Sequence, residues 1–244
     1  DGIVYNTPIS LNGGKLSDAV GNNVPLGFTS LALPAVLVDT VVPAISSITP
    51  PADGSYKQSD TLTFVAHFNK AVTLTSPYAD LVINVGGENK LAHYISGSGS
   101  ADLVFQLAVN FSSADLNGLE VISPLTLIST ATLRDGNGNH AALNFAPLLM
   151  PAVTIDSKKP TTSKLAVVTA KIYKAGDTLS LLAEFDKPVV ITNTPRIAVL
   201  IGATTVYANY VSSPANNKAL FNLSIGFGHN DSDGISIIGP LDVA

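Results

Sequence analysis

The sequence contains no cysteine and few charged residues. Without cysteine there is no disulfide framework, no thiolate zinc site and no cysteine nucleophile, so any metal would bind through oxygen or histidine. Charged residues make up 13% of the chain, against about a quarter in ordinary globular domains. The surface must therefore depend on Ser, Thr, Asn and Gly for its polarity.

Basic clusters and long apolar runs are also missing. The 13 Lys and Arg residues are scattered and the net charge is -5, which argues against nucleic acid as a partner. No apolar run approaches the roughly 20 residues of a membrane helix, so we expect no membrane span. The opening residues, DGIVYNTPIS, have neither the basic end nor the apolar region of a signal peptide.

Two stretches of the chain are near-copies of one another. YKQSDTLTFVAHFNKAV at 56–72 returns as YKAGDTLSLLAEFDKPV at 173–189, a spacing of 117 (173 − 56). After a one-residue gap the match continues, with Gly118 and Gly234 at a spacing of 116 (234 − 118). A period of this length is that of a whole domain, so the chain is a tandem array.

The repeat occurs three times, twice incompletely. An Asp-x-x-x-Pro element at 39–43 and again at 156–160 marks the junctions. On this frame residues 1–37 are the C-terminal strands of a preceding repeat and 38–154 are a complete repeat. Residues 155–244 are then a repeat that lacks its last strands.

Short alternating segments with Gly, Pro, Asn and Asp between them fill the complete repeat. They are ISSIT, TLTFVAHF, LVINV, LAHYIS, DLVFQLAV, LEVIS, ATL and ALNFA. None keeps helical spacing, and about eight short strands in such a length are typical of an immunoglobulin-like sandwich. We therefore predict an all-β protein of tandem immunoglobulin-like antiparallel β-sandwiches.

Four spaced motifs carry a family resemblance. YKAGDTL followed by EFDKPV, AHYISGSGS, DGNGN and the Asp-x-x-x-Pro junction together resemble the tandem Ig-like repeats of large bacterial surface adhesins and extracellular fibre proteins. The resemblance implies an extracellular, cell-surface rod, often dependent on calcium. One departure is the lysine in FNKAV and FDKPV, where a small or acidic residue is expected.

Calcium binding is the most specific chemical hypothesis that the sequence supports. The DGNGN loop places Asp135, Asn137 and Asn139 at alternate positions, so that their oxygens can converge on a hard cation. The other candidate ligands for Ca2+ are Asp231 and Asp233 in HNDSDGI, with Asp39 or Asp156 adding a carboxylate at a junction. The alternative is that Asp and Asn beside Gly make Asx-turns.

The incomplete repeats at the two ends raise the possibility of strand exchange between copies. Residues 12–37 are the equivalents of the strands that the last repeat lacks, so one chain's head would fill another's tail by β-addition and give a filament. The alternative is an excerpt from a longer array, in which adjacent repeats are the partners. The candidate inter-subunit residues are Asn12, Lys15, Leu16, Asp18, Val24, Leu26, Phe28 and Leu31.

No enzyme is expected. The four histidines fall at positions that the repeats do not share, and the three glutamates supply no facing pair for glycoside hydrolysis. We therefore expect no catalytic residue, and a structural unit of an extracellular bacterial stalk, adhesin or filament. The alternative is a secreted module that binds a host or matrix glycan or protein through loop tips.

Overall fold

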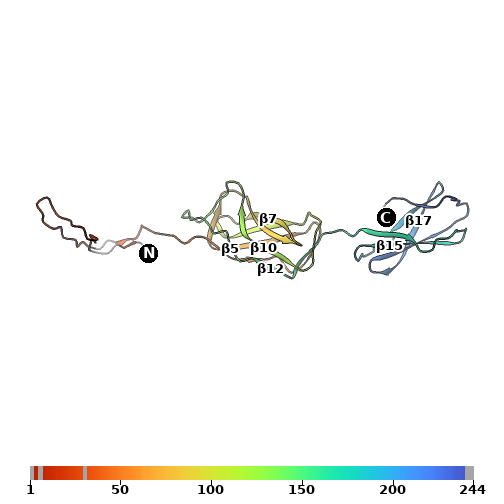
Figure 1. The fold of residues 1–244 in the computed structure, drawn as a ribbon, viewed down its shortest axis with the longest axis horizontal. Coiled ribbons are helices and arrows are strands. Elements are labelled where there is room, and N and C mark those ends of the chain that lie inside the picture. Colours follow the sequence, from red (N-terminus) through yellow and green to blue (C-terminus); the bar gives the residue numbers. More distant parts are fainter. Residues whose placement is uncertain (1–2, 5–7, 30–31, 240–244) are drawn as a thin grey trace. The chain divides into compact units, whose positions relative to one another are not determined.

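The computed structural model describes residues 3–4, 8–29 and 32–239 and divides the chain into two compact units, 1–157 and 158–244 (Figure 1). Every regular element in the described residues is a β-strand, and no helix among them could cross a membrane. Nearly all strand pairs are antiparallel. The predicted all-β, immunoglobulin-like fold class is confirmed.

An eight-stranded antiparallel sheet forms most of the first unit. Its order is β11-β5-β8-β7-β6-β10-β12, with β3 also paired to β5. The strands are β3 (Ile45–Thr49), β5 (Thr61–Leu74), β6 (Ala79–Val85), β7 (Glu88–Ser96), β8 (Ser100–Ala108), β10 (Leu119–Leu127), β11 (Leu133–Arg134) and β12 (Leu148–Met150).

A second, three-stranded sheet closes the first unit. It consists of β4 (Gly54–Tyr56), β9 (Ala114–Asp115) and β13 (Val153–Asp156). The middle strand, β13, runs parallel to β4 and antiparallel to β9.

The core of the first unit follows the two-residue period of its strands. On β5 the side chains of Leu62, Phe64 and Ala66 are fully buried, while the alternate residues face outward. Phe105 on β8 lies opposite Phe64 and is also fully buried. The middle strand of the second sheet, β13, contributes Val153 and Ile155 to the same core.

Within residues 3–4, 8–29 and 32–36, the segment ahead of the first sandwich pairs with itself as a long irregular hairpin. Strands β1 (Ile3–Val4) and β2 (Ala32–Leu33) pair at its base, and a bridge between Ser17 and Asn23 pairs it near its tip. None of its described residues is buried. The hairpin therefore pairs its backbone without enclosing a core.

The second unit repeats the main sheet of the first in the same order. Its order, β14-β15-β18-β17-β16-β19, corresponds to β3-β5-β8-β7-β6-β10. Ala208, Ala219 and Phe221 are fully buried in it, and Phe221 is the repeat equivalent of Phe105. The strands are β14 (Thr162–Val167), β15 (Thr178–Phe185), β16 (Arg196–Ile201), β17 (Thr204–Ala215), β18 (Lys218–Ser224) and β19 (Ser236–Ile237).

One strand prediction was wrong, and two strands were missed. The segment ALNFA, 142–146, has no extended ladder and makes only isolated bonds, such as Leu125 N to Leu143 O at 2.9 Å. Its apolar side chains Leu143 and Phe145 pack on the core, which explains the alternation. Strands β12 and β13 follow it and were not predicted.

Candidate functional site

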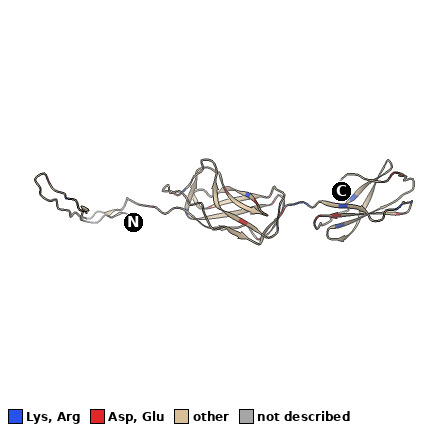
Figure 2. Ribbon diagram, viewed as in Figure 1, with Lys and Arg blue, Asp and Glu red and all other residues tan. Residues whose placement is uncertain are grey.

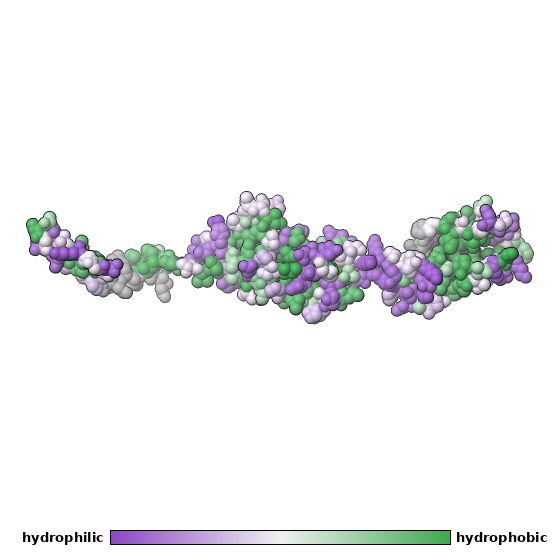
Figure 3. All heavy atoms as spheres, viewed as in Figure 1, coloured by the Kyte–Doolittle hydropathy of each residue, from purple (hydrophilic) through white to green (hydrophobic). Residues whose placement is uncertain are grey.

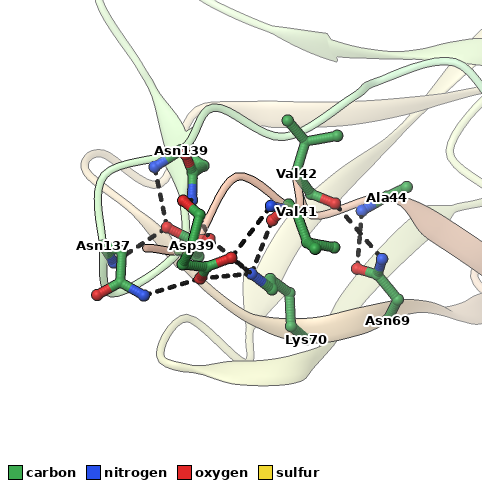
Figure 4. A network of polar contacts seen from close by, with 9 residues as sticks. Asp39, Val41, Val42, Ala44, Asn69, Lys70, Asn137 and Asn139 are labelled. Atoms are coloured by element: carbon green, nitrogen blue, oxygen red, sulfur yellow. Dashed lines mark hydrogen bonds and ion pairs between the residues drawn. The ribbon is translucent and has the colours of Figure 1, made fainter. Parts of the chain in front are cut away.

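A network of charged and polar groups lies where the chain enters the first sandwich (Figure 4). Nζ of Lys70 lies 2.8 Å from Oδ2 of Asp39 and 3.0 Å from Oδ2 of Asp135. The same nitrogen donates to the carbonyl oxygen of Val41 at 2.7 Å. One ammonium group therefore joins the Asp-x-x-x-Pro segment, strand β5 and the DGNGN loop.

The two asparagines of the loop complete this network. Nδ2 of Asn137 donates to Asp39 at 2.8 Å, and Nδ2 of Asn139 donates to Asp135 at 3.0 Å. Oδ1 of Asp135 accepts the backbone N–H groups of both asparagines, at 3.0 and 2.9 Å. The loop thus holds itself in shape and ties the entering segment to the sandwich.

The electrostatics follow from this geometry. The pKa of the Asp135 carboxyl lies well below its ordinary value, first because of the Asn139 amide and then because of Lys70. The pKa of Asp39 is lowered chiefly by Lys70, and the pKa of Lys70 is raised chiefly by Asp39. All three groups are therefore ionised at neutral pH.

The structure brings four predicted calcium ligands together, namely Asp39, Asp135, Asn137 and Asn139, around an ammonium group. Within residues 8–29 and 32–239, no group of three or more His, Asp or Glu side chains is placed to hold a metal ion. Lys70 is the lysine of FNKAV, and it supplies the positive charge between the two carboxylates. Calcium binding stays a prediction.

The remaining predicted ligands lie elsewhere. Asp156 ends strand β13 and pairs with Ala114 in the ladder. In the second unit, Oδ2 of Asp231 accepts the N–H of Gly202 at 2.7 Å and Oδ1 accepts that of Gly234 at 2.7 Å. Asp233 is exposed two residues further on.

In both units, an aspartate carboxylate accepts the backbone N–H groups of two glycines, as Asp231 does. In the first unit Asp115 accepts the N–H of Gly86 at 2.6 Å and that of Gly118 at 3.1 Å. The bonds to Gly202 and Gly234, in that order, lower the pKa of Asp231. The repetition of the same bonds favours the Asx-turn interpretation over a metal site here.

The predicted inter-subunit residues lie in the hairpin. Val24 N donates to Leu16 O at 3.0 Å and Ile9 N donates to Leu26 O at 3.0 Å, so these segments pair with each other. Asp18 caps the tip by accepting the N–H of Asn22 at 2.8 Å. Asn12, Lys15 and Phe28 lie along the same arms, and Leu31 lies outside the described residues. Pairing with a second chain stays a prediction.

The recurring tyrosines pack as core edges. The ring of Tyr94 meets Phe105 edge to face at 6.0 Å, and that of Tyr210 meets Phe221 at the same distance. The Tyr94 hydroxyl accepts the N–H of Ser98 at 2.9 Å. The Tyr210 hydroxyl likewise bonds with Oγ of Ser213 at 2.9 Å, so both tyrosines are held by contacts within their own units.

Charged side chains are sparse along both units (Figure 2).

No known family model and no curated protein matches the sequence. Among solved structures, a marsupial T cell receptor aligns over 80% of this chain and 70% of its own, at 10% identity and a TM-score of 0.33. Function must therefore be argued from the residues themselves.

Proposed function

We propose that this chain is a structural segment of an extracellular bacterial surface stalk, adhesin or filament built from tandem Ig-like units. The observation that carries the proposal is the repetition of one strand plan in two successive units. A protein that spans distance can be built from similar folded units in series.

The junction chemistry supports the same function. Lys70 binds the carbonyl of Val41 in the first unit, and its equivalent Lys187 binds the carbonyl of Lys158 in the second. In each unit, therefore, a lysine side chain bonds to the segment through which the chain enters that unit. A repeated bond of this kind suits a chain that must transmit tension from one unit to the next.

Antibody labelling tests the location. Antibodies against the 244-residue chain should label intact cells of the organism that makes it as strongly as permeabilised cells. Labelling only after permeabilisation would contradict the proposal.

Force spectroscopy tests the role. A single chain stretched from its ends should show two separate unfolding events, each releasing about 3.3–3.6 Å per residue of the unfolded unit. Unfolding in one event, or at forces no higher than those of an unstructured chain, would count against a stalk.

A further inference from the structure

The outer side of the main sheet carries an apolar patch in the first unit. Residues of β5 and β8 alternate between the core and the outer side, and Val65 and Val104 are outward-facing partners in the ladder. Ile95 on β7 precedes Ser96, which pairs with Val104, and its side chain is 52% exposed. We call Val65, Val104 and Ile95 the first patch.

The second unit carries the same patch at the repeat spacing. Leu182 and Leu220 are the equivalents of the two valines, at spacings of 117 and 116 (182 − 65, 220 − 104), and they are again partners in the ladder. Val211, the equivalent of Ile95, is 53% exposed. We call Leu182, Leu220 and Val211 the second patch. Figure 3 shows hydrophobic residues at the surface of both units.

This exposure is a property of the sheet in each unit. The first unit has its own β13 over the core, and its outer side is nevertheless uncovered at Ile95 and at Leu91, which is 44% exposed. The second unit has the same uncovered side at Val211 and at Tyr207, which is 39% exposed. Two apolar surfaces of the same plan are therefore available on one chain.

The charges beside the two patches have opposite signs. In the first unit Asp102 on β8 pairs with Nδ1 of His67 on β5 at 2.7 Å. Its equivalent on β18 is Lys218, at a spacing of 116 (218 − 102), and this lysine pairs with Glu184 on β15 at 3.1 Å. The same cross-strand pair is therefore built with its acidic and basic members exchanged.

A second ladder position shows the same reversal. Asp80 on β6 bonds to Nδ1 of His93 on β7 at 2.8 Å. Its equivalent is Arg196 on β16, at a spacing of 116 (196 − 80), whose guanidinium lies over the Tyr207 ring at 4.0 Å. The outward-facing acidic residues of the first main sheet are Asp80, Asp102 and Glu120, and the outward-facing basic residues of the second are Lys164, Arg196 and Lys218.

The composition of the two units agrees with this difference. Residues 38–157 contain 4 basic and 10 acidic residues, a net charge of -6 (4 − 10). Residues 158–244 contain 8 basic and 6 acidic residues, a net charge of +2 (8 − 6). Two first units repel each other, and so do two second units, whereas a first and a second unit attract each other.

We propose that the outer face of β5, β8 and β7 in one copy of this chain binds the outer face of β15, β18 and β17 in a second copy. The first patch packs on the second patch, and the acidic groups around the one lie against the basic groups around the other. Charge complementarity selects this pairing over contacts between equivalent units. The contact goes beyond the proposed stalk, because it joins copies through the sides of their units.

Sedimentation of the full chain over a range of concentrations tests this proposal. The wild type should self-associate. Ile95→Lys blocks the first patch and Val211→Asp blocks the second, and each should weaken association about tenfold or more because a charge would have to be buried in the contact. A mixture of the two variants should associate again, because each keeps the intact patch that the other has lost.

Two exposed positions outside the patches provide matched controls. Ile128, which follows β10, is 42% exposed, and Val190, which follows β15, is 93% exposed. Ile128→Lys and Val190→Asp should associate like the wild type, and circular dichroism should give all four variants the wild-type melting temperature. About 1 M sodium chloride, which screens charges beyond about 3 Å, should weaken association of the wild type.

Several results would overturn the contact. A monomeric wild type would remove it, and so would equal losses in the patch and control variants. Association of Val211→Asp at the wild-type level would mean that first units pair with first units, and a mixture that stays monomeric would exclude the pairing of first with second units. Insensitivity to salt would remove the charge complementarity that selects the partner.

These outcomes are separate from the test of location. Surface labelling together with a monomeric chain would remove the lateral contact and leave the stalk. Association in solution without surface labelling would do the reverse.

Discussion

Nζ of Lys70 lies 3.0 Å from Oδ2 of Asp135, whose side chain is only 4% exposed. Replacing the lysine leaves that carboxylate shielded from water beside the carboxylate of Asp39. We expect Lys70→Met to lower the melting temperature of the first unit by several degrees, because an ion in such a place needs its partner.

A matched substitution separates this effect from the loss of any lysine. Lys57 pairs with Asp60 at 3.5 Å, but its side chain is 79% exposed. Lys57→Met should change the melting temperature little. Equal effects of the two substitutions, measured by calorimetry, would show that the junction network adds nothing special.

Acid should weaken the first unit through the same carboxylate. Because the folded-state pKa of Asp135 lies below its ordinary value of 3.8, its ionised form stabilises the fold fully above that value. The stabilisation is lost as the pH falls toward the folded-state pKa. Melting temperatures between about pH 6 and pH 2 should therefore drop below about pH 4, and Asp135→Asn should flatten the drop. An unchanged slope in that variant would contradict the assignment.

Calcium should have no effect on the wild-type junction. The ammonium of Lys70 already neutralises Asp39 and Asp135, so calcium chloride and EDTA should give the same melting temperature. Lys70→Gln removes that charge and supplies an oxygen, and we expect this variant to become more stable with calcium. A calcium-dependent shift in the wild type would instead support the calcium site predicted from the sequence.

Alanine substitution at two equivalent glycines should lower the stability of the two units by different amounts. Gly118 and Gly234 have φ values of 107° and 110°, so alanine is strained at both by about 1–3 kcal/mol. At Gly118 the added methyl also overlaps Pro151, whereas at Gly234 it meets open space. Chemical denaturation should show the larger loss for Gly118→Ala, and equal losses would contradict the difference between the units.

The closing strand of the first unit should contribute strongly to its stability. Ile155 is fully buried between β4 and β9, and Ile155→Ala should cost about 2–5 kcal/mol. Thr154→Ala, on the other face, should cost less than about 1 kcal/mol. Denaturant titration of the first unit measures both, and similar costs would mean that β13 adds little to the core.

The sequence predicted the long strands well because their alternation and their repetition agree. TLTFVAHF lies within β5, and its inward residues are those expected from the two-residue period. Strand β13 was not predicted because four residues, VTID, are too few to show a period. The resemblance of VTID to VLVD was visible as a junction motif, but its pairing with β4, 99 residues earlier (153 − 54), was not.

The polar network was predicted in part. Spacing alone brought Asp135, Asn137 and Asn139 together in one loop, and the junction motif added Asp39. The role of Lys70 was missed because this residue lies on β5, far in the sequence from both Asp39 and the DGNGN loop. Its departure from the resemblance did not indicate which groups its ammonium would contact. Its recurrence as Lys187 was the available signal.

The parallel pairing of β13 with β4 has a mechanical consequence. Tension along the chain enters the first unit ahead of β3 and leaves it after Asp156, at the end of β13. Parallel neighbours pulled from opposite ends slide past each other, so their hydrogen bonds must fail together and not one after another. Strand β13, which covers the core, is then also the strand whose hydrogen bonds to β4 resist stretching. A unit without such a strand would be the first to unfold under tension.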